Sequence, residues 1–306
     1  MKNRNKKSRH CRATVKRSMY QQMKNRSKKS ICWIFMLLLC GIMLLGGCGE
    51  KTTDEAFTDD LTTALTERWD QADSNESDYG ALAQTEYDIL KKYQDQTFEN
   101  KELGTLAKEY ITAVETQVNA ADYLESDYNK FAEMYWIEGG TARYDTLSTM
   151  VKEELWEVPE GYQASWKDME STNEEVEKSN HIEVLNMRVT GDSLAGTTYC
   201  YPLLKIKNNT KEKIDMVQME LQVLDKNGSV LETISLMINN IAPQQTGWTQ
   251  KTFLQSDLDK VAAFEVSGFD LSKQTAPSSF MPYESTTYIA APHFEKKDIK
   301  IQIKEY

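Results

Sequence analysis

The 306-residue chain contains few of the side chains on which catalytic sites and metal centres usually depend. It has 3 histidines, 5 cysteines and 6 prolines, and only His181 and His293 lie beyond residue 10. Nucleophilic catalysis needs a base next to its nucleophile, and structural zinc sites need spaced cysteines and histidines. Neither pattern occurs, and there is no phosphate-binding glycine loop or Gly-x-Ser-x-Gly. We therefore predict no catalytic, cofactor-binding or metal-binding residues, no enzymatic activity and no cofactor.

Acidic residues are abundant, 47 in all, but their pattern identifies no paired acid and base. Adjacent carboxylates such as Glu153 and Glu154 point apart on a helix, so a glycosidase-like pair cannot be chosen from them. The run Asp225-Lys226-Asn227-Gly228 begins like a calcium loop, but its twelfth position is Leu236 instead of glutamate. We predict a hairpin turn there, because Asn-Gly accepts the positive φ angles of such turns.

One long hydrophobic run occurs, near the N-terminus. Residues 31–47 carry no charge over 17 positions and lead into Leu45-Gly46-Gly47-Cys48. The run is short for a membrane span of about 20 residues, and small residues suit a signal peptidase. This ending resembles the lipobox of bacterial lipoproteins. The resemblance implies cleavage between Gly47 and Cys48 and lipid attachment to the Cys48 sulfur. An uncleaved membrane anchor is the alternative.

The first 30 residues carry 12 lysines and arginines and no acid, as in the basic region that stays cytoplasmic during export. Residues 1–8 are nearly repeated at 23–30, so Met1, Met19 and Met23 are all candidate starts. Removing residues 1–47 leaves 259 residues and takes the formal net charge from −11 to −23. Such a surface excludes nucleic acid as a partner and repels anionic lipids and wall polymers. We expect a protein held by lipid on the extracytoplasmic face of the cell membrane.

The mature chain would keep two cysteines, Cys48 and Cys200. With lipid on Cys48, no intramolecular disulfide is available. Cys200 lies between Tyr199 and Tyr201 in an apolar strand pattern. We predict that it is a buried apolar side chain and not a nucleophile.

Helical periodicity covers residues 56–158, after a polar tether at 48–55. Apolar residues recur every three or four positions, and no proline lies between Leu61 and Leu155. The pattern predicts an antiparallel bundle of three or four helices, with Gly139-Gly140 ending one of them. The helical stretches begin near Phe57, Tyr79, Leu103, Tyr128 and Tyr144.

Two features of this region have open interpretations. The aromatic residues of the apolar stripes either line a ligand groove or form the core, and helical spacing favours the core. Arg143 either binds an anion or pairs with neighbouring acids, and pairing is favoured. The aromatic residues concerned are Trp69, Tyr79, Tyr87, Tyr110, Phe131 and Trp136.

Residues 159–180 interrupt the pattern with polar and acidic residues, among which Trp166 is the one large apolar anchor. We interpret this segment as an acidic linker with at most one marginal helix.

From 181 to 306 the hydrophobic period changes to two, which predicts strands. Seven short strands at this spacing predict a two-sheet, immunoglobulin-like sandwich. The predicted class of the whole chain is therefore α+β. The strands are expected at 182–189, 199–208, 214–225, 230–238, 248–254, 261–271 and 299–303.

Part of this region resembles a known family. Asn208-Asn209-Thr210 and Asp225-Lys226-Asn227-Gly228 follow the pattern of the FxLYD-type domain of bacterial surface lipoproteins. The stretch 221–225 has aliphatic residues in place of the name-giving Phe and Tyr. The resemblance covers about residues 182–271. It implies a small β-sandwich on an extracytoplasmic protein, with no catalytic residues to carry over.

These observations together predict a non-catalytic binding or adaptor module for a protein or cell-envelope component. The alternative is an accessory or solute-binding component of a transport system, with a small pocket among the helices. A cell-wall-modifying enzyme is the third hypothesis.

Overall fold

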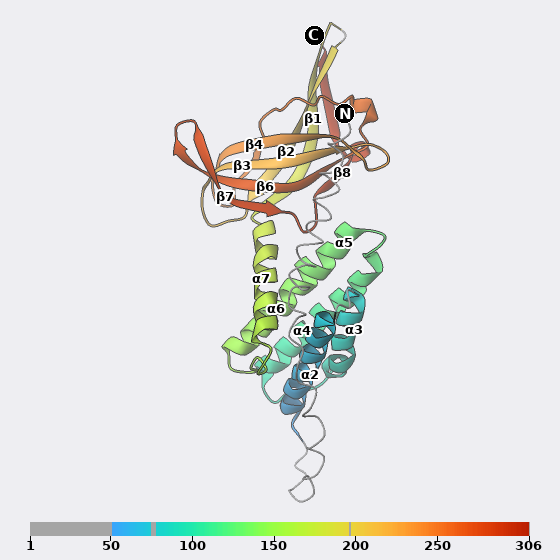
Figure 1. Cartoon of the computed structure of the whole chain (residues 1–306), viewed down its shortest axis with the longest axis vertical. Coiled ribbons are helices and arrows are strands. Elements are labelled where there is room, and N and C mark those ends of the chain that lie inside the picture. The colour runs from blue at the N-terminus through green and yellow to red at the C-terminus, as the bar shows by residue number, and fades with distance from the viewer. Residues whose placement is uncertain (1–50, 75–77, 196, 306) are drawn as a thin grey trace, which may run out of the picture. The chain divides into compact units, whose positions relative to one another are not determined.

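The computed structural model describes residues 51–74, 78–195 and 197–305. Cys48 and the rest of the predicted lipobox lie outside these residues. Within them, helices extend to Ser179 and strands begin at Ile182 (Figure 1), which confirms the α+β class. They divide into two compact units. The helical unit contains residues 51–127 and 134–171, and the β unit contains 128–133 and 172–305. No helix in the described part of the chain has the length and apolar character to span a membrane.

The helices begin where the sequence places capping side chains. Thr52 and Glu55 form a reciprocal capping box at the start of the first helix. The Asp78 carboxylate accepts a hydrogen bond from the Ala81 amide, 3.0 Å away, at the start of the next. The main helices are α2 (Thr53–Asp73), α3 (Tyr79–Leu90), α4 (Lys101–Ala120), α5 (Tyr128–Ala132), α6 (Thr141–Lys152) and α7 (Gln163–Ser179).

The apolar stripes of α2, α3, α4 and α6 form one core. α3 packs against both α2 and α4, and α4 also packs against α6. Of the aromatic residues in question, Trp69 and Tyr110 belong to this core, and Phe131 is fully buried. The favoured interpretation of these three aromatics as core residues is confirmed.

Gly139-Gly140 does not end a helix, contrary to prediction. A π-helix, η3 (Glu133–Gly140), runs through both glycines and continues directly into α6. A Cβ on Gly139 would lie 2.7 Å from the Gln117 Cγ and 2.9 Å from the Ala113 carbonyl oxygen. The glycine is therefore required by the close approach of η3 to α4, and not by a turn.

The segment predicted as an acidic linker contains α7, a helix of 17 residues. Trp166 and Met169 on this helix pack against the core of the helical unit. The boundary between the two units falls within α7, between residues 171 and 172. The many acidic residues of this segment led to the prediction of a linker. The two apolar residues Trp166 and Met169 nevertheless pack on the core, so the first half of α7 is part of a folded unit.

The strands form two sheets. One has four strands in the order β5-β2-β1-β9, in which β9 runs parallel to β1 and the other pairs are antiparallel. The other contains β4-β3-β6-β7, with β8 also paired to β6. The bounds are β1 (Ile182–Leu194), β2 (Thr197–Asn208), β3 (Ile214–Leu224), β4 (Val230–Ile241), β5 (Thr246–Trp248), β6 (Ala263–Ala276), β7 (Ser279–Thr287), β8 (His293–Glu295) and β9 (Lys300–Glu305).

Both sheets contribute to a single hydrophobic core. Buried residues alternate along the central strands, such as Leu204 and Ile206 on β2 and Val217 and Met219 on β3. This is the period-two pattern that the sequence predicts.

The strand prediction was incomplete in three places. The strand expected at 248–254 is only β5, ending at Trp248, with one further bridge between Leu254 and Cys200. Strands β7 and β8 were missed, because the prolines at 277, 282 and 292 indicated a loop. Pro282 lies within β7, a strand that pairs only with β6 in the sheet order, so its missing amide costs no central ladder bond.

The hairpin predicted at residues 225–228 is present between β3 and β4. Gly228 has a φ of +72°, which the turn requires. The Asp225 carboxylate accepts hydrogen bonds from the amides of Asn227 and Ser229, both at 2.8 Å. The amide of Ser229, followed by that of Asn227, holds the pKa of Asp225 below its ordinary value.

We expect Asp225→Asn to lower the free energy of unfolding near neutral pH. A carboxylate with a depressed pKa in the folded state contributes stability above its unfolded pKa of about 3.9. That contribution is lost as the pH falls through the lower pKa of the folded state. The difference in the free energy of unfolding between wild type and variant should therefore disappear in acid. Urea unfolding at about pH 7 and about pH 2.5 measures it. The control is Asp298→Asn, since Asp298 accepts no side-chain hydrogen bond among the described residues. An Asp225→Asn difference that stays the same in acid would contradict the prediction.

Candidate functional site

The centre of the helical unit contains a buried carboxylate, that of Glu86 on α3, with no exposed surface. Arg68 on α2 donates from Nη1 to its Oε2 at 2.6 Å. Arg143 on α6 donates from Nε to both carboxylate oxygens, at 3.0 and 3.1 Å. Tyr110 on α4 donates its hydroxyl proton to Oε1. Four helices therefore meet at one carboxylate, and Arg143 pairs with an acid, as the favoured interpretation predicted.

A second layer of hydrogen bonds extends this network to η3. Arg68 also donates to the Gln117 side-chain oxygen at 3.0 Å and to the Tyr135 hydroxyl at 2.9 Å. The Gln117 amide in turn donates to the backbone carbonyl of Tyr135, at 2.9 Å. Gln117 therefore bridges the buried ion pair and the π-helix, whose i→i+5 pairing is unusual and needs such support.

The network holds two guanidinium groups and one carboxylate, so one positive charge is in excess. The aromatic ring of Tyr110 lies 5.8 Å from the Arg143 guanidinium carbon, and that of Tyr135 lies 6.0 Å from that of Arg68. Both distances allow cation–π attraction. Nη1 of Arg143 contacts the Met169 sulfur at 3.0 Å, and its buried Nη2 has no hydrogen-bond partner among the described residues. The arrangement is suited to holding helices together.

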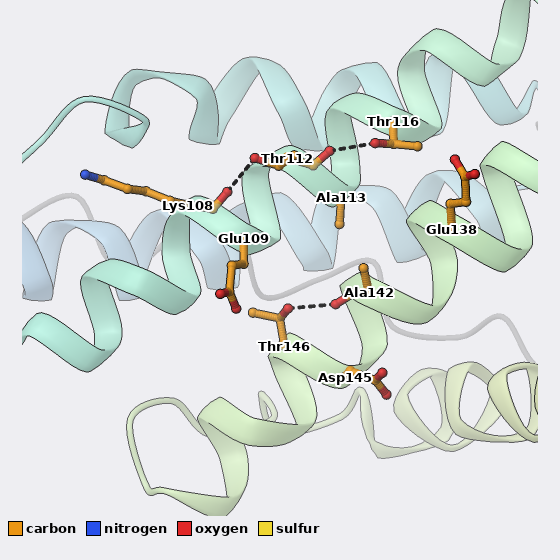
Figure 2. Close-up of a pocket in the computed structure, with 9 residues that line it drawn as sticks. All are labelled: Lys108, Glu109, Thr112, Ala113, Thr116, Glu138, Ala142, Asp145 and Thr146. Atoms are coloured by element: carbon orange, nitrogen blue, oxygen red, sulfur yellow. Dashed lines mark hydrogen bonds between the residues drawn. The ribbon is translucent and has the colours of Figure 1, made fainter.

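A shallow groove of about 540 Å³ lies beside this network, between α4 and the η3–α6 segment (Figure 2). Its three threonine hydroxyls donate to backbone carbonyls one helical turn earlier, so they are already satisfied. None of the six aromatic residues considered for a ligand groove lines it. The groove is lined by Lys108, Glu109, Thr112, Ala113, Thr116, Glu138, Ala142, Asp145 and Thr146.

The two histidines of the β unit each lie beside carboxylates. His181 Nδ1 is 2.9 Å from Glu284 Oε1. His293 lies 3.6 Å from Glu265 and 3.3 Å from Glu295. His181 is half-buried and His293 is exposed, and both have acidic partners. No group of three histidine, cysteine or acidic side chains able to hold a metal ion occurs among the described residues.

Cys200 is buried in the β core, with 6% of its surface exposed. Burial raises the pKa of its thiol, an effect that the Lys296 charge only partly opposes. The prediction of a buried apolar side chain is confirmed, and a protonated thiol is a poor nucleophile.

The outer face of the β5-β2-β1-β9 sheet carries the most distinctive surface of the β unit. We define this face by the residues that alternate with core residues such as Val189 and Leu204. Two exposed aromatics stand on it: Tyr199 is 41% exposed, and Phe253, which follows β5, is 44% exposed. In register, the outer face contains Glu183, Arg188, Thr190, Asp192, Tyr199, Tyr201, Leu203, Lys205, Lys207, Trp248, Lys300, Gln302 and Lys304.

Aromatic rings and cations are interleaved on this face. The Phe253 ring lies 5.7 Å from that of Tyr199 and 6.4 Å from that of Tyr201. The Arg188 guanidinium lies 4.0 Å over the Trp248 ring, and Lys251 Nζ lies 5.0 Å over that of Tyr201. The buried Nε of Arg188 has no hydrogen-bond partner among the described residues. Arg188 is therefore held by an aromatic ring and not by a carboxylate, so its charge stays uncompensated.

Sequence reasoning found neither the buried network nor the outer face. Glu86 and Arg68 are charged residues within amphipathic stretches, and no sequence period marks them as buried partners. The outer face has a period-two signal, since Tyr199, Tyr201, Lys205 and Lys207 alternate with apolar positions on β2. That signal indicates a face but not its partners from β1, β5 and β9, which are up to a hundred residues away.

No protein-family model matches the chain, and no curated protein matches it. Among solved structures, IrmA from Escherichia coli is 16% identical, over 32% of this chain and 86% of IrmA, with a TM-score of 0.23. The Pseudomonas fluorescens alkylpurine DNA glycosylase AlkC, bound to DNA with an abasic site analogue, is 8% identical. That match covers 80% of this chain and 75% of AlkC, with a TM-score of 0.17. Neither likeness is strong enough to support an argument about fold or function.

We expect Glu86→Gln to lower the free energy of unfolding by about 3–5 kcal/mol, because it leaves two buried guanidinium groups without a compensating charge. The control is Glu109→Gln, an exposed carboxylate in the groove, for which a change within about 0.5 kcal/mol is expected. Urea unfolding of both variants measures the difference. Equal stability of the two variants would show that the network does not stabilise the helical unit.

Proposed function

We propose that this chain is a lipid-anchored extracytoplasmic lipoprotein that acts as a non-catalytic binding or adaptor module for a protein or cell-envelope component. In this proposal an antiparallel helical bundle follows the tether, and an immunoglobulin-like, FxLYD-related sandwich presents the binding surface. The lipobox at residues 45–48 supports the location. The outer face of the β5-β2-β1-β9 sheet is the observation that supports binding.

The outer face favours binding because it combines exposed rings with unneutralised cations. Aromatic and arginine side chains are enriched at recognition surfaces, since they bury large areas with little loss of rotamer freedom. Tyr199 and Phe253 are each more than 40% exposed and in mutual contact, so they form a preformed hydrophobic patch. A sheet face also holds its side chains rigidly, which lowers the entropy lost on binding.

The two other hypotheses have less support. A solute-binding component needs a pocket with apolar walls and a few convergent polar groups. The groove between α4 and α6 is shallow, none of the six aromatic residues lines it, and its threonine hydroxyls are already hydrogen-bonded within their helices. For a wall-modifying enzyme, the groove offers the carboxylates of Glu109, Glu138 and Asp145, but all three are exposed, whereas a catalytic general acid of this kind lies in a buried environment.

Lipid anchoring is tested by Cys48→Ser. Without a thiol at position 48, no thioether to lipid can form, so we expect the variant to lose the labelling that the wild type shows when the bacteria grow with radioactive palmitate. The control is Cys200→Ser, which removes the other mature cysteine and should leave the labelling unchanged. Absence of labelling in the wild type would favour the uncleaved anchor.

Envelope binding is tested by sedimentation of the mature chain, residues 48–306 with Cys48→Ser, with purified cell envelopes. We expect the protein to sediment with the envelopes and Tyr199→Ala/Phe253→Ala to remain largely in the supernatant. The control is Tyr123→Ala/Tyr283→Ala, which removes two exposed aromatics that are not on the outer face. Loss of sedimentation after protease treatment of the envelopes would identify a protein partner. No sedimentation of the wild type would contradict the proposal.

A further inference from the structure

The outer face has a charge opposite to that of the rest of the mature chain. Five of the outer-face side chains are basic, Lys251 beside the Tyr201 ring adds a sixth cation, and two, Glu183 and Asp192, are acidic. The face therefore carries an excess of four positive charges, in a mature chain whose formal net charge is −23. The basic side chains are Arg188, Lys205, Lys207, Lys251, Lys300 and Lys304.

Most of these cations have no internal partner. Lys207 lies 3.9 Å from Glu183, at the limit of an ion pair. The other five form no ion pair with any described residue. A folded acidic protein has many carboxylates available to neutralise its lysines. Cations that are concentrated on one face without neighbouring carboxylates attract anions from solution.

The spacing of the cations fits a repeating anion. Outer-face residues two apart on one strand are about 6.6 Å apart, and neighbouring strands are about 4.8 Å apart. Lys205 and Lys207 on β2 and Lys300 and Lys304 on β9 therefore form two rows, with β1 between them. An extended chain with a charge on every unit can contact several of these side chains at once, whereas a small anion reaches only one or two.

The exposed rings select the chemical class of this anion. The faces of Tyr199 and Phe253 carry the negative part of the aromatic quadrupole, which attracts weakly positive C–H groups. The C–H faces of pyranose rings present such groups in a flat array, while their hydroxyls remain solvated. A polypeptide has no equivalent flat C–H array at every unit.

We propose that the outer face of the β5-β2-β1-β9 sheet binds an anionic polysaccharide. This inference rests on the proposed binding function and names the partner class of the same site. Tyr199, Tyr201 and Phe253 stack on sugar rings. Arg188 and the lysines of β2 and β9 contact the anionic substituents.

The test uses the mature chain, residues 48–306 with Cys48→Ser, because the 12 basic residues of the leader would bind polyanions by themselves. Binding to immobilised polygalacturonate, poly-glutamate and dextran is measured by biolayer interferometry in low and high salt. We expect the tightest binding to polygalacturonate, about fivefold weaker binding to poly-glutamate, which has no sugar rings, and none to uncharged dextran. Polygalacturonate binding should be at least tenfold weaker in high salt, since exposed charges are screened.

Two double variants separate the contributions of charge and rings. Lys300→Glu/Lys304→Glu should weaken polygalacturonate binding about tenfold, since two attractions become repulsions. Tyr199→Ala/Phe253→Ala should weaken it about fivefold. The matched controls are Lys226→Glu/Lys273→Glu, in the other sheet and its hairpin, and Tyr123→Ala/Tyr283→Ala. Thermal unfolding of each variant verifies that it is folded.

Three results would overturn the proposal. Equal binding to poly-glutamate and polygalacturonate would show that rings play no part and that an acidic polypeptide fits as well. Equal loss in the control variants would show that general charge, and not the outer face, is responsible. Absence of polygalacturonate binding would also overturn it. If envelope sedimentation still occurred, the proposed binding function would stand while the assignment of its partner failed.

Discussion

The helical unit depends on the burial of one carboxylate. Glu86 has no contact with water, so its charge must be compensated inside the protein. Arg68 from α2, Arg143 from α6 and Tyr110 from α4 provide this compensation, and each must be within hydrogen-bond distance at the same time. The positions of four helices are therefore coupled, because displacing any one leaves a buried charge without a partner. The close contact of Gly139 with α4 brings η3 near enough for Gln117 to join the same network.

The β unit depends on a different constraint, the alternation of side chains along each strand. Once Val189, Leu204 and Ile206 face the core, Arg188, Tyr201 and Lys205 must face outward. A shift of one residue would bury the cations and expose the core, so the register is strongly specified. The same rule that builds the core thus assembles the outer face, although its residues come from segments far apart in the sequence.

The uneven distribution of charge bears directly on function. From composition, the acidic mature chain is expected to repel wall polymers and anionic lipids. The outer face departs from that average, because its basic residues are concentrated on one sheet and, apart from Lys207, form no ion pair with a described residue. In the proposed function, an anionic partner is attracted to this positive face, although the average charge of the mature chain would repel it. The proposed lipid on Cys48 would hold the chain at the membrane.

Local periodicity determined much of the architecture from sequence alone. The period of 3.6 in residues 56–158 predicts helices and the period of two after residue 181 predicts strands, because both depend on neighbouring residues. The Asp225–Gly228 hairpin and the Asp78 cap are likewise local, and both are present. The failures have equally local causes. Proline suppressed β7, the acidic composition of 163–179 concealed α7, and a glycine pair suggested a stop where close packing is the reason.

The sequence by itself determined the α+β class, the change from helices to strands near residue 180, and the burial of Cys200. The tertiary structure alone decided which charges are buried and which are exposed. Glu86 and Arg143 are 57 residues apart, and Arg188 and Lys300 belong to strands at opposite ends of the β unit. Such pairs leave no periodic signal, because they depend on how whole elements pack and pair. The buried network and the basic outer face are therefore properties of packing and strand order, not of any segment considered alone.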